Sequence, residues 1–168
     1  MALQAPPIQR HDVQILTIPF QLSGQLETVG PVFNFINAPS RDSLSLYNVR
    51  LTPLTPGSPL KGLSCPHVVI RRSQVTLLYF TSAESHASIR LLARRELLVA
   101  YTPLAVCRGY FHLAAEASVH DFLGLIPGDM LPITEVHVFP LIELPAPFPT
   151  QADLLLVNRS HLQLYHQA

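Results

Sequence analysis

Short apolar runs alternate along the chain with polar corners and with segments rich in proline and glycine. The apolar runs cover 13–26, 44–54 and 67–80 in the first half, and 97–113, 131–141 and 154–165 in the second. Runs of this length, bounded by Gly, Pro, Asn and Ser, are typical of β-strands. The pattern therefore predicts a chain built mainly from short strands.

Two of the runs contain residues that predict a bend, a break or a turn within the run. The run 13–26 is apolar on both faces, and it is interpreted as one long strand or two short ones. Pro19 must lie at an edge, a bend or a break, and Gly24 allows a sharp strand bend. In 67–80 the polar corner 71–73 separates two apolar segments. This corner predicts either a tight turn between antiparallel strands or a sharp corner in one bent sheet.

The residues of three further segments predict the structure that each segment forms. Residues 1–11 contain Pro6 and Pro7 and are expected to form a loose leader, and Val32–Ile36 is predicted to be a strand. Ser82–Glu96 is predicted to be a helix, because serines near its start can cap it and its apolar residues fall near helical spacing.

The same order of runs occurs twice. Val13–Gly24 matches Leu98–Gly109 at an offset of 85 positions, and Val49–Leu54 matches Val136–Leu141 at an offset of 87. Self-similarity in one order, at nearly one offset, indicates an internal repeat.

The match continues to the end of the chain. At the offset of 87, Ile70–Leu78 falls on Val157–Tyr165. We therefore predict a first module at 1–81, a helical linker at 82–96 and a second module at 97–168.

Both halves carry three motifs in the same order: a glycine at an early strand bend, an Asp-x-apolar segment and a late corner that contains arginine. These motifs are Gly24 and Gly109, Asp42–Ser45 and Asp121–Gly124, and the corners at 70–73 and 156–160. Together they resemble the Sm-like family, in which the first motif reads Asp-x-apolar-Asn and the corner reads apolar-Arg-Gly. The match of Asp121 to Asp42, at an offset of 79, requires length changes in the surrounding loops.

The second half is also similar to short bacterial Sm-like modules. Their three segments correspond here to Gly109–Leu113, Asp121–Leu123 and Leu131–Thr134. The resemblance implies an all-β fold of two fused small five-stranded bent-sheet barrels, Sm-like or SH3-like, joined by a short helix.

Sm-like RNA binders hold a base with the Asn of the first motif and approach it closely at the Arg-Gly corner. In this chain Ser45 and Gly124 stand in place of that Asn, and Ser73 and Ser160 stand in place of the corner Gly. A side chain at the corner obstructs close approach of the backbone to a base. The resemblance therefore implies the fold without the family's RNA pocket.

Composition narrows the class of partner. Eleven basic and eleven acidic residues give a formal net charge of zero, whereas nucleic-acid binding usually requires a basic excess. Hydrophobic residues make up 48% of the chain and charged residues only 13%, which favours apolar surface that a partner covers. No signal peptide or membrane span is expected, and two cysteines form no disulfide framework. We expect a cytoplasmic protein.

Catalytic motifs are not found in the sequence. The eight histidines form no HExxH motif and no Cys/His pair with zinc spacing, and no Gly-x-Ser-x-Gly or phosphate-binding glycine loop is present. We therefore expect no enzymatic activity and no cofactor.

Two sets of residues are candidates for function. The first could contact a ligand or nucleic acid, because arginine pairs with phosphate or carboxylate: Arg71, Arg72, Asn158 and Arg159. The second could form an exposed strand edge that pairs with another chain: Val75, Leu77, Tyr79, Leu162, Leu164 and Tyr165.

Two functions follow from these candidates. The favoured one is a scaffold or interaction protein that assembles with itself or with another protein through strand edges. The alternative is binding of RNA or single-stranded DNA by the arginine corners, which predicts binding that weakens steeply with added salt.

Overall fold

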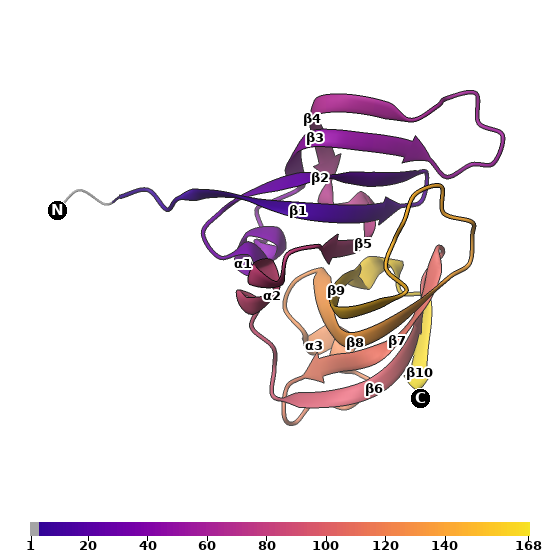
Figure 1. The fold of residues 1–168 in the computed structure, drawn as a ribbon. Helices are drawn as coiled ribbons and strands as arrows, with labels where there is room; N and C mark the ends of the chain where they lie inside the picture. Colours follow the sequence, from indigo (N-terminus) through magenta and orange to yellow (C-terminus); the bar gives the residue numbers. More distant parts are fainter. Residues whose placement is uncertain (1–3) are drawn as a thin grey trace.

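The computed structural model describes residues 4–168, and in these residues ten strands form one antiparallel sheet (Figure 1). The strand order is β10-β6-β7-β8-β9-β5-β1-β2-β3-β4. The all-β expectation is confirmed, with only short helices between the strands. The sheet is open, with β4 and β10 at its two ends. Closure of each half into a barrel stays a prediction.

The first half contributes five neighbouring strands, in the order β5-β1-β2-β3-β4. Its elements are β1 (Ile8–Thr17), β2 (Phe20–Val29), α1 (Val32–Asn37), β3 (Ser43–Pro53), β4 (Leu63–Arg71), the 3-10 turn η1 (Arg72–Gln74) and β5 (Val75–Phe80). The run 13–26 is thus two strands, with Pro19 in the turn between them. The corner at 71–73 connects β4 to β5 without pairing them, so it is a corner and not a hairpin turn.

The second half repeats this arrangement in the order β10-β6-β7-β8-β9. Its elements are β6 (Arg94–Tyr101), β7 (Ala105–Leu113), α3 (Phe122–Leu125), β8 (Met130–Pro140), β9 (Gln151–Asn158), the 3-10 turn η2 (Arg159–His161) and β10 (Leu164–Gln167). Each strand of the first half therefore has a counterpart five strands later along the chain.

The pairing registers repeat as well. Val13 lies opposite Gly24 in the first half, and Leu98 lies opposite Gly109 in the second, which reproduces the offset of 85. Both glycines interrupt the pairing of their strand with the next one. A Cβ atom at Gly24 would lie 2.9 Å from the carbonyl oxygen of Tyr47, so close backbone approach requires glycine there. The predicted strand bend is confirmed.

The later strands keep the offset of 87, and this corrects one of the matched motifs. Ser43 pairs with Arg71 as Met130 pairs with Asn158, so the residue before β8 that corresponds to Asp42 is Asp129. The expected match to Asp121 is wrong, because Asp121 precedes α3 and lies before the loop that leads to β8.

Two predicted elements differ in the structure. Val32–Ile36 is helical and belongs to α1, where the amide of Phe35 donates to the carbonyl of Pro31. Val32 and Ile36, four positions apart, are both buried, and a short apolar run fits this spacing as well as a strand.

The helix predicted over 82–96 covers only α2 (Ala83–Ala87). Arg94–Tyr101 instead pairs along its whole length with β7, and this tertiary pairing overrides the helical spacing of the segment. The start of β1 at Ile8 also shortens the expected leader, and residues 1–3 lie outside the described part of the chain.

Buried apolar side chains form two clusters, one centred on each half. The clusters meet at the pairing of β5 with β9, which within residues 4–168 is the only place in the strand order where a strand of the first half neighbours one of the second. We call this pairing the internal junction.

Candidate functional site

The internal junction is a short antiparallel ladder in which each half fills the core of the other. Leu77 pairs with Val157, and Leu78 pairs with Leu156. Leu77 belongs to the core cluster of the second half, whereas Leu156 belongs to that of the first half. Both side chains have no exposed surface. Burial of apolar area on both faces of the ladder therefore stabilises the contact between the halves.

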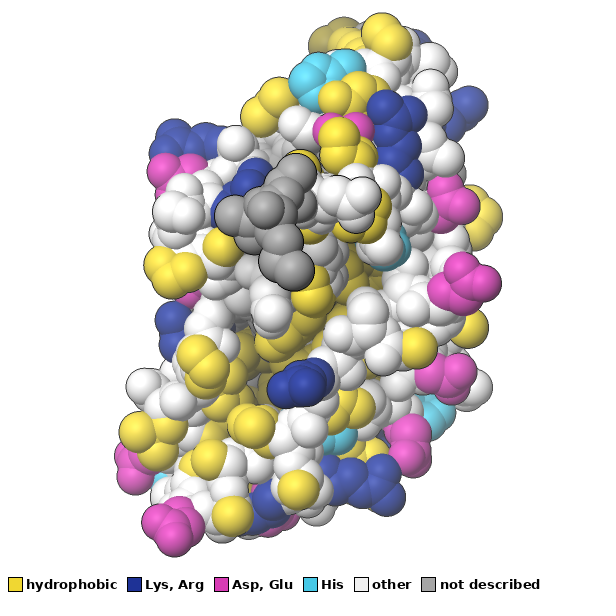
Figure 2. Space-filling view, turned by 90° about the vertical axis from the view of Figure 1, so that its left-hand side faces the viewer, with side chains coloured by type: hydrophobic (Ala, Val, Ile, Leu, Met, Phe, Trp, Pro, Cys, Tyr) yellow, Lys and Arg dark blue, Asp and Glu magenta, His cyan; other side chains and the backbone are white. Residues whose placement is uncertain are grey.

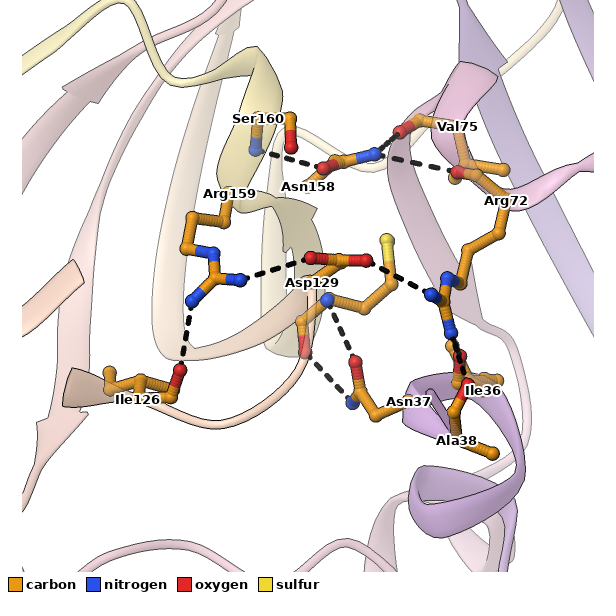
Figure 3. Close-up of polar contacts among 11 residues, drawn as sticks. Ile36, Asn37, Ala38, Arg72, Val75, Ile126, Asp129, Asn158, Arg159 and Ser160 are labelled. Atoms are coloured by element: carbon orange, nitrogen blue, oxygen red, sulfur yellow. Dashed lines mark hydrogen bonds and ion pairs between the residues drawn. The ribbon is translucent and has the colours of Figure 1, made fainter. Parts of the chain in front are cut away.

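Two corner arginines bind one carboxylate beside this ladder (Figure 3). Arg72 donates from Nη2 to Oδ2 of Asp129 over 3.0 Å, and Arg159 donates from Nη2 to Oδ1 over 3.1 Å. Arg72 belongs to the first half, whereas Asp129 and Arg159 belong to the second. Asp129 thus ties together the corners of both halves.

Each arginine also fastens the segment before the third strand of its own half. Arg72 donates from Nη1 to the carbonyls of Ile36 and Ala38, and Arg159 donates from Nη1 to those of Leu123 and Ile126. Ile36 and Leu123 are 87 positions apart, so the two guanidinium groups occupy equivalent places. Their shared geometry is a structural feature of the repeat.

Two asparagines close the polar part of the internal junction (Figure 3). Asn37 donates from Nδ2 to the carbonyl of Met130 over 3.1 Å and accepts from the Met130 amide over 2.9 Å. Asn158 is buried and donates to the carbonyls of Val75, over 2.8 Å, and of Arg72, over 3.4 Å. Both side chains satisfy backbone groups of the opposite half.

His161, in the corner of the second half, also contacts the first half. His161 donates from Nε2 to the carbonyl of Ser73 over 2.7 Å. Its Nδ1 lies 2.8 Å from the hydroxyl of Thr76, which donates to it because the other ring nitrogen carries the proton. The contact between the halves is therefore apolar along the ladder of β5 and β9 and polar at the two corners beside it.

The predicted ligand-contact residues divide accordingly. Arg72, Asn158 and Arg159 are engaged in or beside the internal junction. Arg71 is exposed at the end of β4. The structure thus brings three of the four together around Asp129, whose importance the sequence reasoning missed because it matched Asp42 to Asp121.

The predicted assembly edge needs a correction. Val75 and Leu77 are buried and Tyr79 is half-buried, because β5 lies between β1 and β9 and is not an edge strand. β10 is an edge strand, since it ends the sheet, and its Leu164 is 53% exposed; a role of this edge in assembly stays a prediction.

The two other predicted edge residues are half-buried. Leu162 lies between η2 and β10, and Tyr165 packs on Phe122 with its hydroxyl donating to the carbonyls of Val119 and His120. Both side chains pack against the core cluster of the second half.

The other free edge, β4, was not predicted. Val69 of β4 is 59% exposed, whereas its counterpart Leu156 in β9 is completely buried at the internal junction. Pro66 within β4 was a usable signal, because proline lacks an amide donor and is confined to edge strands and bulges.

A separate hollow lies on the face that carries α1 and α2, and Figure 2 shows apolar side chains along its floor with charged ones around it. The groove beside α1 is lined by Gln9, Pro31, Phe33, Asn34, Ser88 and Arg90. Among residues 4–168, this lining includes no histidine or carboxylate that could act there as acid or base.

Two histidines with shifted pKa values lie outside the lining of this groove. Burial lowers the pKa of His11, whose ring contacts the hydroxyls of Ser85 and Thr28. Burial also lowers the pKa of His112, and the bond to the Leu92 carbonyl partly opposes this shift. Within the described part of the chain, no group of three or more His, Cys, Asp or Glu side chains is placed to hold a metal ion.

Comparison with known proteins found no matching family model, no matching curated protein and no matching solved structure. Within residues 4–168, no helix has the length and apolar character needed to cross a membrane.

Proposed function

We propose that this chain is a non-enzymatic building block that assembles with protein partners through the two free strands at the ends of its sheet. The supporting observation is that strands at equivalent places in the two halves differ in pairing and exposure. β5 and β9 pair with each other and are buried, whereas their counterparts β10 and β4 lie at the sheet ends with exposed apolar side chains. An edge strand offers amide and carbonyl groups that pair readily with another backbone.

The arginine corners support the same proposal. Arg72 and Arg159 already donate from both terminal nitrogens to Asp129 and to backbone carbonyls within the chain. A zero net charge also lacks the basic excess on which nucleic-acid affinity depends. Cys65 and Cys107 are free thiols, which agrees with a reducing compartment such as the cytoplasm.

Light scattering of the purified protein, together with its 260/280 nm absorbance ratio, tests the proposal. We expect a particle larger than one chain, free of nucleic acid, whose size is insensitive to moderate salt. Combining Val69→Lys with Leu164→Lys should reduce it to one chain, because lysine on both edges prevents strand pairing.

The control is Ile8→Lys, since Ile8 is 66% exposed on β1, a strand inside the sheet. This variant should keep the particle size of the wild type. A wild-type protein of single-chain mass that carries RNA would contradict the proposal.

A further inference from the structure

We propose that the proline-rich loop between β8 and β9, together with the sheet of the first half, forms a binding site for a small carboxylic acid that also carries an amide group. This inference goes beyond the proposed assembly, because it concerns a small molecule and not a partner chain. The loop residues Pro145–Pro147, which we call the strap, border a hollow of about 490 Å³. We call this hollow the strap cavity, and its volume lies in the range of cavities that hold small ligands.

One buried side chain of the first half holds the strap in place. Gln21 of β2 is 4% exposed, donates from Nε2 to the carbonyl of Ala146 over 3.0 Å, and accepts at Oε1 from the Ala146 amide over 3.2 Å. Pro145 and Pro147 flank Ala146 and have no amide hydrogen of their own. The strap, which crosses from the second half to the first (Figure 1), therefore forms a fixed and largely apolar wall of the cavity.

Three polar residues of the strap cavity lie in one row across neighbouring strands. Gln14 of β1 pairs with Ser23 of β2, and Ser23 pairs with Arg50 of β3. All three residues line the cavity. Because neighbouring strands lie about 4.8 Å apart, the Cα atoms of Gln14 and Arg50 are separated by about 10 Å. A small molecule with two functional groups can therefore contact both side chains at once.

Arg50 is the only charged residue among those of 4–168 that line the strap cavity. Its side chain is exposed and takes part in none of the five ion pairs found within residues 4–168. A Cβ atom at Gly62 would lie 4.0 Å from Nη2 of Arg50 and 3.6 Å from Oγ1 of Thr52, so the guanidinium and the hydroxyl border the same open space. Both groups donate hydrogen bonds, and a guanidinium can donate two in parallel to a carboxylate.

Gln14 supplies the second group for recognition. Its Oε1 is buried and has no hydrogen-bond partner in the described part of the chain. A buried acceptor without a donor is costly, so a ligand that turns this side chain toward the cavity and pairs with it gains that free energy. The side-chain amide offers one acceptor and two donors, and an amide group of the ligand can pair with both kinds of atom.

The lining as a whole favours a carboxylate close to an amide, as in an N-acylated amino acid. The single positive charge of Arg50 balances the single negative charge of a carboxylate, whereas a phosphate dianion would leave a negative charge uncompensated. The strap presents two proline rings and the methyl group of Ala146, which suit a small apolar side chain on the ligand.

The equivalent row of the second half differs in all three residues. Val99 pairs with Arg108, and Arg108 pairs with His137, so these residues stand in the places of Gln14, Ser23 and Arg50. Valine has no polar group that could pair with an amide of the ligand. The proposed site therefore belongs to the first half alone, and the exposed Arg108 provides a matched control.

Saturation-transfer NMR with N-acetylalanine tests the inference, because this method observes the small molecule and works for a protein particle of any size. We expect N-acetylalanine to bind. N-acetylalaninamide, which lacks the charge, and propionate, which lacks the amide, should each bind more weakly by roughly 3-fold or more, since each loses hydrogen bonds to the site.

Substitutions assign the binding to the strap cavity. Arg50→Gln should weaken the binding of N-acetylalanine by about 10- to 100-fold, the range of a hydrogen bond to a charged group. Gln14→Leu should weaken it by roughly 3- to 10-fold, the range of a neutral hydrogen bond. Arg108→Gln is the control and should bind as the wild type does.

Gly62→Val provides a second test, which blocks the cavity without removing a polar group. The nearest atoms to a Cβ atom at Gly62 lie at 3.6 Å or more, so the fold accepts a side chain there. The added methyl groups should occupy the space beside Arg50 and abolish binding, whereas Gly62→Ala should retain part of it.

The same chemistry occurs at the C-terminus of a peptide, and acetylated trialanine distinguishes the two sources. Tighter binding than that of N-acetylalanine would assign the site to a peptide C-terminus, and weaker binding would assign it to a free small molecule.

Three results would overturn the inference: no binding of N-acetylalanine, equal binding of N-acetylalanine and its neutral amide, or equal binding by the wild type and Arg50→Gln. Light scattering separates this inference from the proposed function, because Arg50→Gln should keep the particle size of the wild type. A wild type of single-chain mass would remove the proposed assembly and leave the binding site unaffected.

Discussion

At the scale of single residues, Asp129 connects the two halves through a carboxylate that the sequence analysis did not single out. Its carboxylate accepts from one arginine of each half, and its backbone carbonyl accepts from the amide of Arg159. Arg72 is largely buried, whereas the carboxylate is about one third exposed. Removing the negative charge leaves two guanidinium groups close together without compensation.

We expect Asp129→Asn to lower the free energy of unfolding by about 1–2 kcal/mol, because charge-assisted hydrogen bonds are lost at a partly screened site. The measurement is the urea midpoint at unchanged m value. Glu116→Gln, at an exposed loop position, is the control and should leave the midpoint in place. Equal midpoints for the two variants would show that the shared carboxylate contributes nothing.

The buried histidine His112 predicts a pH dependence of stability. Burial lowers its pKa from the ordinary value of 6.5, with the bond to the Leu92 carbonyl opposing and Arg95 adding to the shift. Below about pH 6.5 the unfolded chain therefore binds more protons at this site than the folded chain does. The free energy of unfolding is highest above about pH 6.5 and falls as the pH decreases below it. His11 contributes in the same direction, because burial also lowers its pKa.

Urea midpoints at pH 7.5 and pH 5.5 measure this dependence. The midpoint should be lower at pH 5.5, and His112→Gln should reduce the difference between the two pH values, whatever its effect on absolute stability. An unchanged difference in this variant would mean that His112 is protonated equally in the folded and unfolded chain.

At the scale of elements, the bend of the second strand in each half depends on glycine. A Cβ atom at Gly109 would lie 2.7 Å from Cγ2 of Ile133 and 3.0 Å from the carbonyl oxygen of Thr134. Gly109→Ala should therefore destabilise the fold by about 1–3 kcal/mol through overpacking at a backbone contact. Gly124→Ala, which meets no atom within 4 Å, is the matched control in the same thermal melt. Similar melting temperatures would show that β7 can move away from β8.

The sequence predicted the type of element correctly where the apolar run was long and occurred in both halves. β3 and β8 were anticipated in this way, since both runs match at one offset. Val32–Ile36 was assigned wrongly, because a five-residue apolar run satisfies both a strand and a helical turn. The helix at 82–96 was overestimated, because pairing of β6 with β7 is a tertiary effect that local spacing does not encode.

At the scale of the whole molecule, the sequence predicted the repeat but not which strands form the internal junction. The offsets of 85 and 87 are reproduced by the pairing registers of both halves. Which of four similar strands would pair inside the chain depends on how the halves meet, and no single strand carries that information. This is why Leu77 was expected at an exposed edge, whereas Val69 was not considered.

The whole molecule therefore has an inner pair of strands and an outer pair with the same ancestry in the repeat. The inner pair is paired within the chain, whereas the outer pair lies at opposite ends of the sheet with exposed apolar side chains. The proposed assembly uses this outer pair.

Amide hydrogen exchange at low and high protein concentration tests the proposed assembly through the end strands most directly. Amides of β5 and β9 should be protected equally at both concentrations, whereas those of β4 and β10 should gain protection together as the concentration increases. Protection of β4 and β10 that does not change with concentration, in a protein that light scattering shows to be assembled, would contradict assembly through the end strands.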